Sequence, residues 1–161
     1  MGRLGAERLE AGRFENTATW VVRIDPGEDV LASLKRFIAE KGIRQGAVVW
    51  GYGTLSKACL HWVTHNRFPP ENKFGEREGG IEILSMNGSI VDGQPHVHFT
   101  ASTPDGAFGG HLEEGCTCYI LCEVGIAELR GPEMRREMTT VAHDERGHAI
   151  ELPQLRFSGQ H

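Results

Sequence analysis

The sequence predicts an α+β domain in which one principal helix packs against a mainly antiparallel, twisted sheet. Only residues 29–41 repeat their apolar side chains strongly at helical spacing. The other apolar runs are rich in β-branched and aromatic residues and are separated by Gly, Pro, Asn and Asp. Because one helix accompanies many sequential strands, these strands are expected to pair mainly as antiparallel neighbours. The chain of 161 residues fits one domain over residues 13–161, preceded by a flexible N-terminal arm over residues 1–12.

The first strand and the helix lie near the N-terminus. Residues 17–24 read Thr-Ala-Thr-Trp-Val-Val-Arg-Ile, a composition typical of a strand, and Asp25-Pro26-Gly27 ends it. The helix is expected over residues 29–41, and Gly42 is its stop signal.

The middle of the chain is expected to contain strands and one long loop. Residues 46–53 and 57–65 are predicted as two strands joined by a short turn at 54–56. Residues 66–80 combine prolines, glycines and asparagines with charged residues, which predicts a loop. A further strand is expected over residues 81–91.

Turn signals divide the rest of the chain. Asp92-Gly93 is a hairpin dipeptide, and it predicts that residues 94–103 pair with the preceding strand. Pro104-Asp105-Gly106 turns the chain again, and residues 117–129 form the last clear strand. The tail beyond Pro132 fits either a charged strand pair or a short helix.

Composition excludes a membrane protein. The longest apolar stretches, such as residues 47–50 and 118–122, are far shorter than a membrane-spanning helix. The N-terminal residues have no apolar core typical of a secretory signal, and the chain is therefore expected to be cytoplasmic.

The charge balance does not support nucleic-acid binding. Seventeen Lys and Arg face 22 Asp and Glu, so the formal net charge is −5. Phosphate binding needs clustered Lys and Arg, and the best candidate cluster joins Arg130 to Arg135 and Arg136. Because Glu133 and Glu137 interrupt it, the favoured interpretation is a solvated surface of mixed charge.

Four cysteines without a signal peptide indicate a reduced chain rather than a disulfide scaffold. Six residues of one predicted strand share a parity and should point to one buried face: Cys116, Cys118, Ile120, Cys122, Val124 and Ile126. A thiolate metal site would need paired cysteines at metal-ligand spacing, which the sequence lacks. The cysteines are therefore interpreted as core residues.

Three of the eight histidines suggest a metal centre. His96 and His98 flank Val97, so on a strand both imidazoles emerge on one face. His111 follows Gly109-Gly110, and these glycines allow the chain to turn back beside that strand. Three histidines leave a fourth position of a zinc ion open to water or substrate. The alternative is that these are exposed strand histidines that bind no metal. This alternative is favoured for the other five histidines: His61, His65, His143, His148 and His161.

These motifs resemble the PPC domain, the plants and prokaryotes conserved domain. The resemblance covers roughly residues 12–130 and is most specific in His96-Val97-His98 followed by Gly109-Gly110-His111-Leu112. Glu82 to Ile90, Gly115 and the upstream Gly51-Tyr52-Gly53 are also similar. The resemblance implies an α+β fold, a homotrimer and a metal, usually zinc, held by His96, His98 and His111.

The same resemblance raises DNA binding as an alternative. Plant members join this domain to an AT-hook, an Arg-Gly-Arg-Pro element that enters the minor groove. This chain has no such element, and its nearest approach is Gly12-Arg13-Phe14. DNA is therefore a partner that the family label suggests and the charge does not support.

Acetolactate decarboxylase is similar to the PPC domain in fold and also holds zinc through an H-x-H pair and a later histidine. Glu82 and Glu123 are candidates for carboxylates near such a metal, and solvent-facing strand positions are their alternative. No catalytic residue is carried over from that enzyme.

Three functions therefore remain open. The first is a zinc-dependent enzyme or small-molecule binder, the second a DNA-associated regulator, and the third a trimeric scaffold with a structural metal. A physical argument for the trimer comes from residues 57–65, where Leu60, Trp62 and Val63 place apolar side chains on both faces of a strand.

Overall fold

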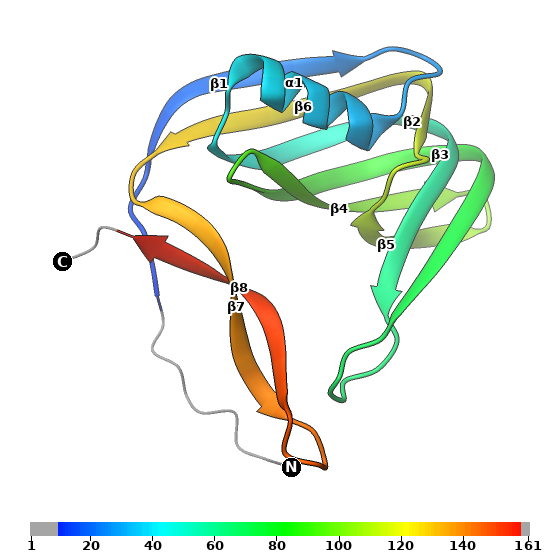
Figure 1. Cartoon of the computed structure of the whole chain (residues 1–161). Helices are drawn as coiled ribbons and strands as arrows, with labels where there is room; N and C mark the ends of the chain where they lie inside the picture. The colour runs from blue at the N-terminus through cyan, green and yellow to red at the C-terminus, as the bar shows by residue number, and fades with distance from the viewer. Residues whose placement is uncertain (1–9, 159–161) are drawn as a thin grey trace.

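The computed structural model describes residues 10–158, so His161 and most of the predicted N-terminal arm lie outside the described residues. The predicted α+β class is confirmed, with one helix and antiparallel strand pairing throughout the described sheets (Figure 1). The elements in chain order are β1 (Glu15–Ile24), α1 (Val30–Lys41), β2 (Gln45–Val63), β3 (Asn72–Val91), β4 (Gln94–Thr103), β5 (Gly106–Leu112), β6 (Thr117–Arg130), β7 (Glu133–His143) and β8 (Ala149–Ser158).

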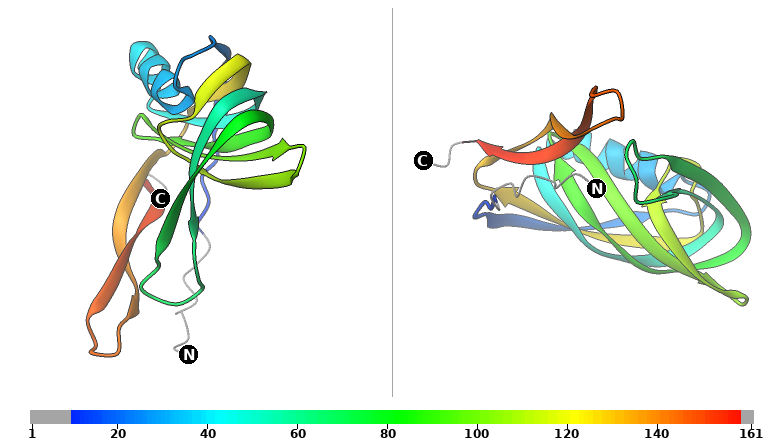
Figure 2. Two further views of the ribbon diagram at one scale, coloured as in Figure 1. Left: turned by 90° about the vertical axis from the view of Figure 1, so that its right-hand side faces the viewer. Right: turned by 90° about the horizontal axis from the view of Figure 1, so that it is seen from below.

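The main sheet curls back on itself. Its six strands follow the order β1-β6-β2-β3-β4-β5, and β5 also pairs with β2. This extra pairing closes β2, β3, β4 and β5 into a ring. The β7–β8 hairpin forms a separate two-stranded sheet, and it projects from the same side of the body as the long end of the β2–β3 hairpin (Figures 1 and 2).

Helix α1 covers one face of the sheet, and its bounds agree with the predicted ones. Asp29 caps it, because Oδ1 accepts a hydrogen bond from the Ala32 N–H at 2.7 Å. Oδ2 of the same carboxylate accepts from the Gly115 N–H at 2.5 Å, which ties the helix to the segment between β5 and β6. Gly42 ends the helix with φ +66°, as its position predicted.

The helix and the concave side of the sheet enclose the core. Side chains of α1 such as Leu34 and Ile38 pack with strand residues that alternate with exposed neighbours, including Val97 and Phe99 of β4. No helix within residues 10–158 combines the length and the apolar character that crossing a bilayer requires.

Strand β2 is longer than predicted. Residues 45–63 form one strand without the turn expected at 54–56, and a bulge between Leu55 and Lys57 takes its place. The predicted loop at 66–80 is also wrong, because β3 begins at Asn72 and pairs with the far half of β2. The physical reason is that this ribbon is solvated, so its polar residues form cross-strand pairs such as Lys57–Glu76 at 2.8 Å.

The predicted cysteine face is right except at Ile120. Cys116, Cys118 and Cys122 are buried, whereas Ile120 is 59% exposed. The register moves from Gly53↔Cys122 to Leu55↔Cys118, so β6 bulges between its two cysteines. The Ile120 N–H then donates to Thr54 Oγ1 at 2.9 Å instead of continuing the ladder.

The C-terminal tail is the strand pair rather than the short helix. Met134 is buried, and its N–H donates to Gln45 Oε1 at 2.5 Å, which anchors β7 to the start of β2. Farther along β7, Arg136 Nη2 donates to Ser89 Oγ at 3.2 Å.

Glycines allow the ring of strands to close. A Cβ on Gly110 would lie 2.7 Å from the His61 carbonyl oxygen of β2, and one on Gly109 would lie 2.6 Å from the Phe99 carbonyl oxygen of β4. The two glycines were expected to supply unusual backbone angles. Their role here is different, since the absence of a side chain lets β5 lie close to both neighbours.

We expect Gly110→Ala to destabilise the fold by about 1–3 kcal/mol, because the new methyl group has to displace the backbone of β2. Urea unfolding followed by circular dichroism measures the loss. Gly80→Ala is the matched control, because a Cβ on Gly80 of β3 meets no atom within 4 Å. Equal unfolding midpoints for the two variants would contradict the close approach of β5 to β2.

Candidate metal centre

Three histidines form a row across neighbouring strands. His61 of β2 pairs with His111 of β5, and His111 pairs in turn with His98 of β4. Directly paired residues of antiparallel strands place their side chains on one face, with Cβ atoms roughly 4.5–5.5 Å apart. The ring closure therefore gathers three imidazoles that are up to 50 positions apart in the sequence.

His96 joins this row from the same strand as His98. Their Nε2 atoms lie 3.2 Å apart, and the intervening Val97 is buried in the core, as predicted. The His111 ring meets both rings edge to face, with centroids 4.6 Å from His96 and 5.3 Å from His98. The rings of the three predicted metal ligands are thus in contact. Among the described residues, however, the group whose possible ligand atoms all lie within 4.8 Å of one another is His61, His111 and Glu113.

A carboxylate completes the other end of the row. Glu113 Oε1 lies 2.5 Å from His61 Nδ1 and 3.1 Å from His111 Nδ1. The His61 and His111 rings stack with centroids 4.4 Å apart. One donor atom from each of His61, His111 and Glu113 lies within 4.8 Å of the others, so this group could also hold a metal ion.

The interpretation of His61 as an ordinary surface histidine is wrong, because its side chain is only 19% exposed and lies against His111. No local pattern predicted this contact, which depends on the long-range pairing of β2 with β5. A local sequence pattern does indicate Glu113. His111-Leu112-Glu113 repeats the i, i+2 spacing of the H-x-H pair, so both polar side chains emerge on one face.

The environment favours the neutral form of two imidazoles, those of His96 and His111. Partial burial lowers the pKa of His96 to about 4, and the positive charges of His111 and Arg136 act in the same direction. Burial also lowers the pKa of His111, followed by the effect of His61, while Glu113 opposes the shift. A neutral imidazole has a free lone pair, which is the form that binds a metal.

One buried nitrogen of the cluster lacks a hydrogen bond. His111 Nδ1 is inaccessible to water, and the Glu113 carboxylate lies near it without the geometry of a hydrogen bond. Leaving a buried polar atom unpaired costs free energy, so such an atom indicates a missing partner. A cation bound to this nitrogen and to the Glu113 carboxylate would supply that partner, and this position belongs to the group of His61, His111 and Glu113.

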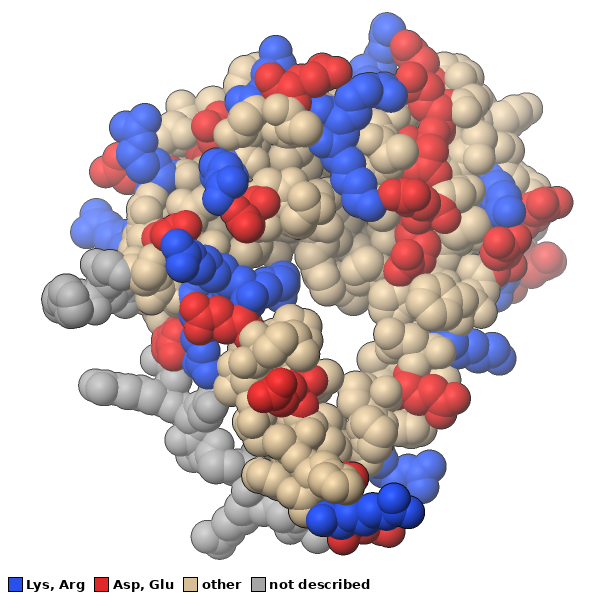
Figure 3. All heavy atoms as spheres, in the orientation of Figure 1, with Lys and Arg blue, Asp and Glu red and all other residues tan. Residues whose placement is uncertain are grey.

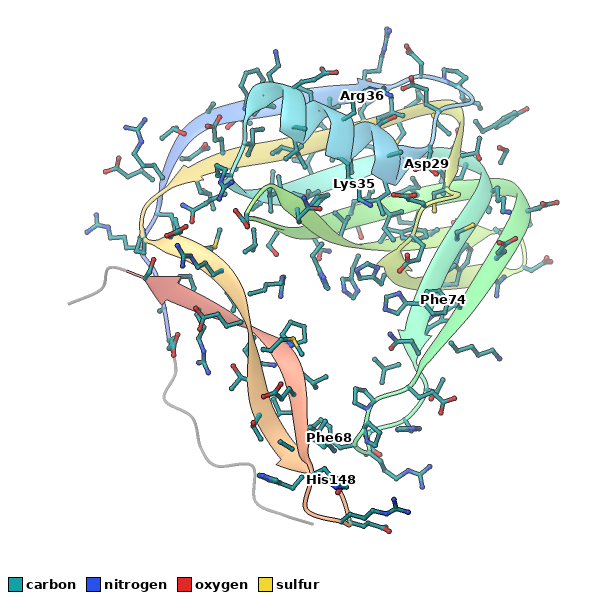
Figure 4. All side chains as sticks on the ribbon, viewed as in Figure 1. Asp29, Lys35, Arg36, Phe68, Phe74 and His148 are labelled. Carbon is teal, nitrogen blue, oxygen red and sulfur yellow. The ribbon has the colours of Figure 1, made fainter. Side chains whose placement is uncertain are left out.

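A pocket of about 420 Å³ adjoins the cluster through Glu113. Phe74 lines this pocket and also contacts His61, with ring centroids 5.2 Å apart. Figure 4 shows Phe74 on the part of β3 that extends beside β2, and it shows His148 near the tip of the β7–β8 hairpin.

Two predicted carboxylates and three histidines lie elsewhere. Glu123 accepts a hydrogen bond from the Tyr52 hydroxyl, and Glu82 pairs with Thr54 and Ser102 in the sheet. Neither belongs to the candidate metal group of the described residues, which is His61, His111 and Glu113. The other histidines with described positions also lie outside that group: His65, His96, His98, His143 and His148.

The cysteines are core residues, as the sequence indicated. All four are free and buried. Burial raises the pKa of Cys116 and of Cys122 to about 12, so both remain neutral thiols. A metal site uses thiolates, so this environment does not suit metal binding.

Comparison with known proteins places this architecture in a family. The family model for the Plants and Prokaryotes Conserved (PCC) domain matches residues 12–130, which leaves the β7–β8 hairpin outside the matched region. The bifunctional protein GlmU of Synechococcus sp. (strain JA-2-3B'a(2-13)) is 31% identical over 115 residues, which are 71% of this chain and 17% of that protein. The chain spans about a sixth of the length of the curated relatives it matches.

Solved structures share the fold. A plant- and prokaryote-conserved (PPC) protein of Pyrococcus horikoshii is 28% identical with a TM-score of 0.70, covering 89% of this chain and 97% of that one. A metal-containing protein of Archaeoglobus fulgidus is 27% identical with a TM-score of 0.67, covering 89% and 99%.

More distant structures show the fold alone. A protein of Bacteroides thetaiotaomicron, provisionally named a DNA-binding protein, is 18% identical with a TM-score of 0.66 over 89% of this chain and 96% of that one. Acetolactate decarboxylase of Bacillus subtilis is 14% identical with a TM-score of 0.51 over 68% and 52%, which confirms the predicted likeness of fold.

Proposed function

We propose that this chain, which belongs to the Plants and Prokaryotes Conserved domain family, binds one divalent metal ion, zinc first among the candidates, through His96, His98 and His111. The separation of the His96 and His98 Nε2 atoms, 3.2 Å, carries the proposal. Two nitrogens bound tetrahedrally to one zinc ion at about 2.0–2.1 Å lie roughly 3.3 Å apart. The strand backbone therefore holds these two donors near the spacing that the metal requires.

The neighbouring residues support this assignment. Glu113 Oε1 lies 3.1 Å from His111 Nδ1, so a carboxylate stands next to one of the proposed metal ligands. His61 contacts the same carboxylate and limits its movement. A metal-containing relative of 27% identity is consistent with the proposal.

The proposed site serves a small molecule. A bound zinc ion would polarise a ligand oxygen or lower the pKa of bound water. The adjoining pocket of about 420 Å³ has the size typical of small-molecule sites, and Phe74 gives it an apolar wall. Three protein ligands leave room for such a molecule, whereas a closed fourth protein ligand would favour the alternative of a structural metal. The four free cysteines fit a reducing compartment such as the cytoplasm.

We further propose that the chain forms a homotrimer, as the family resemblance implies. Of the three apolar residues expected to be covered by a partner, Leu60 is buried within the chain and Trp62 donates from Nε1 to the Gly109 carbonyl at 2.6 Å, whereas Val63 is 60% exposed. A second exposed apolar surface lies on the outer face of the main sheet. Val21 pairs with Gly125 and Tyr52 pairs with Glu123, so Val21 and Tyr52 share the outer face of the sheet.

Trp50 completes this outer patch, which consists of Val21, Trp50 and Tyr52. Trp50 pairs with Gly125 and stacks on Tyr52 with ring centroids 5.9 Å apart. The three side chains are 65%, 37% and 48% exposed. An apolar patch on a sheet face is typical of a subunit interface, and closed cyclic assembly would bury it in every copy.

Metal analysis of protein purified without chelators should find about one divalent ion per chain. His98→Ala should retain less than about a tenth of it, because even outer-shell changes weaken metal binding roughly ten- to a hundredfold. His148→Ala at the hairpin tip is the control and should match wild type. His61→Ala should keep its metal. If His61→Ala loses its metal and His98→Ala keeps the full metal content, the ion is bound by His61, His111 and Glu113 instead.

Light scattering coupled to gel filtration should give a mass near three times 17.8 kDa. Val21→Glu places a charge in the outer patch and should shift the mass toward that of one chain, since an unpaired charge is costly to bury. Ala39→Glu adds the same charge on the exposed side of α1 and should leave the mass unchanged. A wild-type mass of one chain would refute the trimer.

At near-physiological salt we expect no sequence-specific binding of duplex DNA. The net charge is −5, and cations such as Lys35 and Arg36 pair with carboxylates. Figure 3 shows Lys and Arg interspersed with Asp and Glu over the visible face rather than gathered in a stripe. Fluorescence anisotropy with labelled duplexes tests this, and a sequence-selective, salt-sensitive signal would favour the DNA-associated alternative.

A further inference from the structure

The β7–β8 hairpin places one arginine beside the histidine cluster. Arg136 Nη2 donates a hydrogen bond to Ser89 Oγ at 3.2 Å. Ser89 of β3 is paired directly with His96 of β4, so the Ser89 and His96 side chains stand next to each other on one face. The hydrogen bond therefore holds the guanidinium at the His96 end of the cluster, opposite the end that Glu113 occupies.

Arg136 differs from the neighbouring arginines in its partners. Arg135 forms an ion pair with Glu133 at 2.8 Å, and Arg156 forms one with Glu10 at 2.8 Å. Among residues 10–158, no ion pair to a carboxylate is found for Arg136, and its hydrogen bond to Ser89 goes to a neutral hydroxyl. A guanidinium has five N–H donors, so most of the donors of Arg136 remain free for a ligand.

Strand alternation directs the two adjacent arginines to opposite faces of β7. Arg135 and Arg136 are consecutive, and consecutive strand residues point to opposite sides. Arg136 lies on the side that meets the main body at Ser89, while Arg135 pairs with Glu133, two residues away on its own face. The hairpin thus presents one unpaired cation to the cluster.

We propose that Arg136 is an oxyanion-binding residue and that the ligand of the histidine cluster is a small carboxylate that contacts Arg136 and the metal together. The inference rests on the proposed function for its metal end. Arg136 itself is a specificity-determining group for negative charge.

Charge balance supports this ligand class. A divalent ion and Arg136 bring three positive charges to the site, and Glu113 supplies one negative charge close to them. The Ser89 hydroxyl that contacts Arg136 is neutral. An anionic ligand would offset the excess positive charge, whereas a cationic ligand would be repelled. The planar guanidinium matches the two oxygens of a carboxylate.

Succinate is a suitable probe, because it carries a carboxylate at each end and binds free zinc weakly. Isothermal titration calorimetry of the metal-loaded full chain should detect succinate binding. Arg136→Gln should weaken that binding roughly tenfold or more, since charge-assisted hydrogen bonds to the ligand are lost. The Gln side chain can still donate a hydrogen bond to Ser89, so the variant removes the charge but keeps the hydrogen bond between β7 and β3.

Arg135→Gln is the matched control, and its succinate affinity should stay within about twofold of wild type, because Arg135 is paired with Glu133. Metal content should be equal in wild type and both variants. Succinate binding that is absent in wild type, or equal in Arg136→Gln and wild type, would overturn the inference.

The two proposals fail separately in this experiment. If the chain retains metal but binds succinate independently of Arg136, the proposed role of Arg136 is refuted and the proposed metal site stands. If the chain purifies without metal and cannot be loaded with it, the proposed metal-binding function is refuted. If such a chain still binds succinate through Arg136, the oxyanion-binding role of Arg136 stands.

Discussion

The pairing of β5 with β2 is the constraint on which the rest of the site depends. It joins only two residue pairs, Leu60↔Leu112 and His61↔His111, yet it converts an open sheet into a ring of four strands. The first pair is buried and extends the core, and the second lies on the opposite face and begins the histidine row. Gly110 makes the approach feasible, since any side chain there would meet the β2 backbone. The same strand contact therefore contributes both to the packing of the core and to the assembly of the site.

The ring closure also determines the electrostatic character of the cluster. The His61 and His111 rings stack and are both largely buried, and burial lowers the pKa of His111. Burial also lowers the pKa of His96, so the His96 and His111 rings can lie in contact without strong mutual repulsion. Glu113 lies at one end of the cluster and Arg136 at the other, so the cluster lies between a carboxylate and a guanidinium. This polarity would give the proposed ligand a defined orientation, which three histidines alone would not supply.

Local sequence patterns predicted most of what is local in this structure. Asp29 and Gly42 delimit the helix, Asp92-Gly93 forms the hairpin with positive φ at both residues, and the H-x-H pair emerges on one face. Two of the failures come from contacts between strands that are distant in the sequence. Ile120 leaves the core because of a bulge opposite Thr54, and His61 enters the cluster because β2 meets β5. The first part of β3 was predicted as a loop because its residues are mostly polar, and a solvated ribbon lacks a clear apolar alternation.

The proposed metal site on this ring of strands is made of imidazole nitrogens and contains no thiolate ligand. X-ray absorption spectroscopy of the zinc-loaded protein distinguishes these ligand types. We expect a first shell of nitrogen and oxygen atoms at about 2.0–2.1 Å with the multiple scattering of at least two imidazoles. A sulfur shell at about 2.3 Å would refute the proposed site, because it would place the ion among the buried cysteines instead.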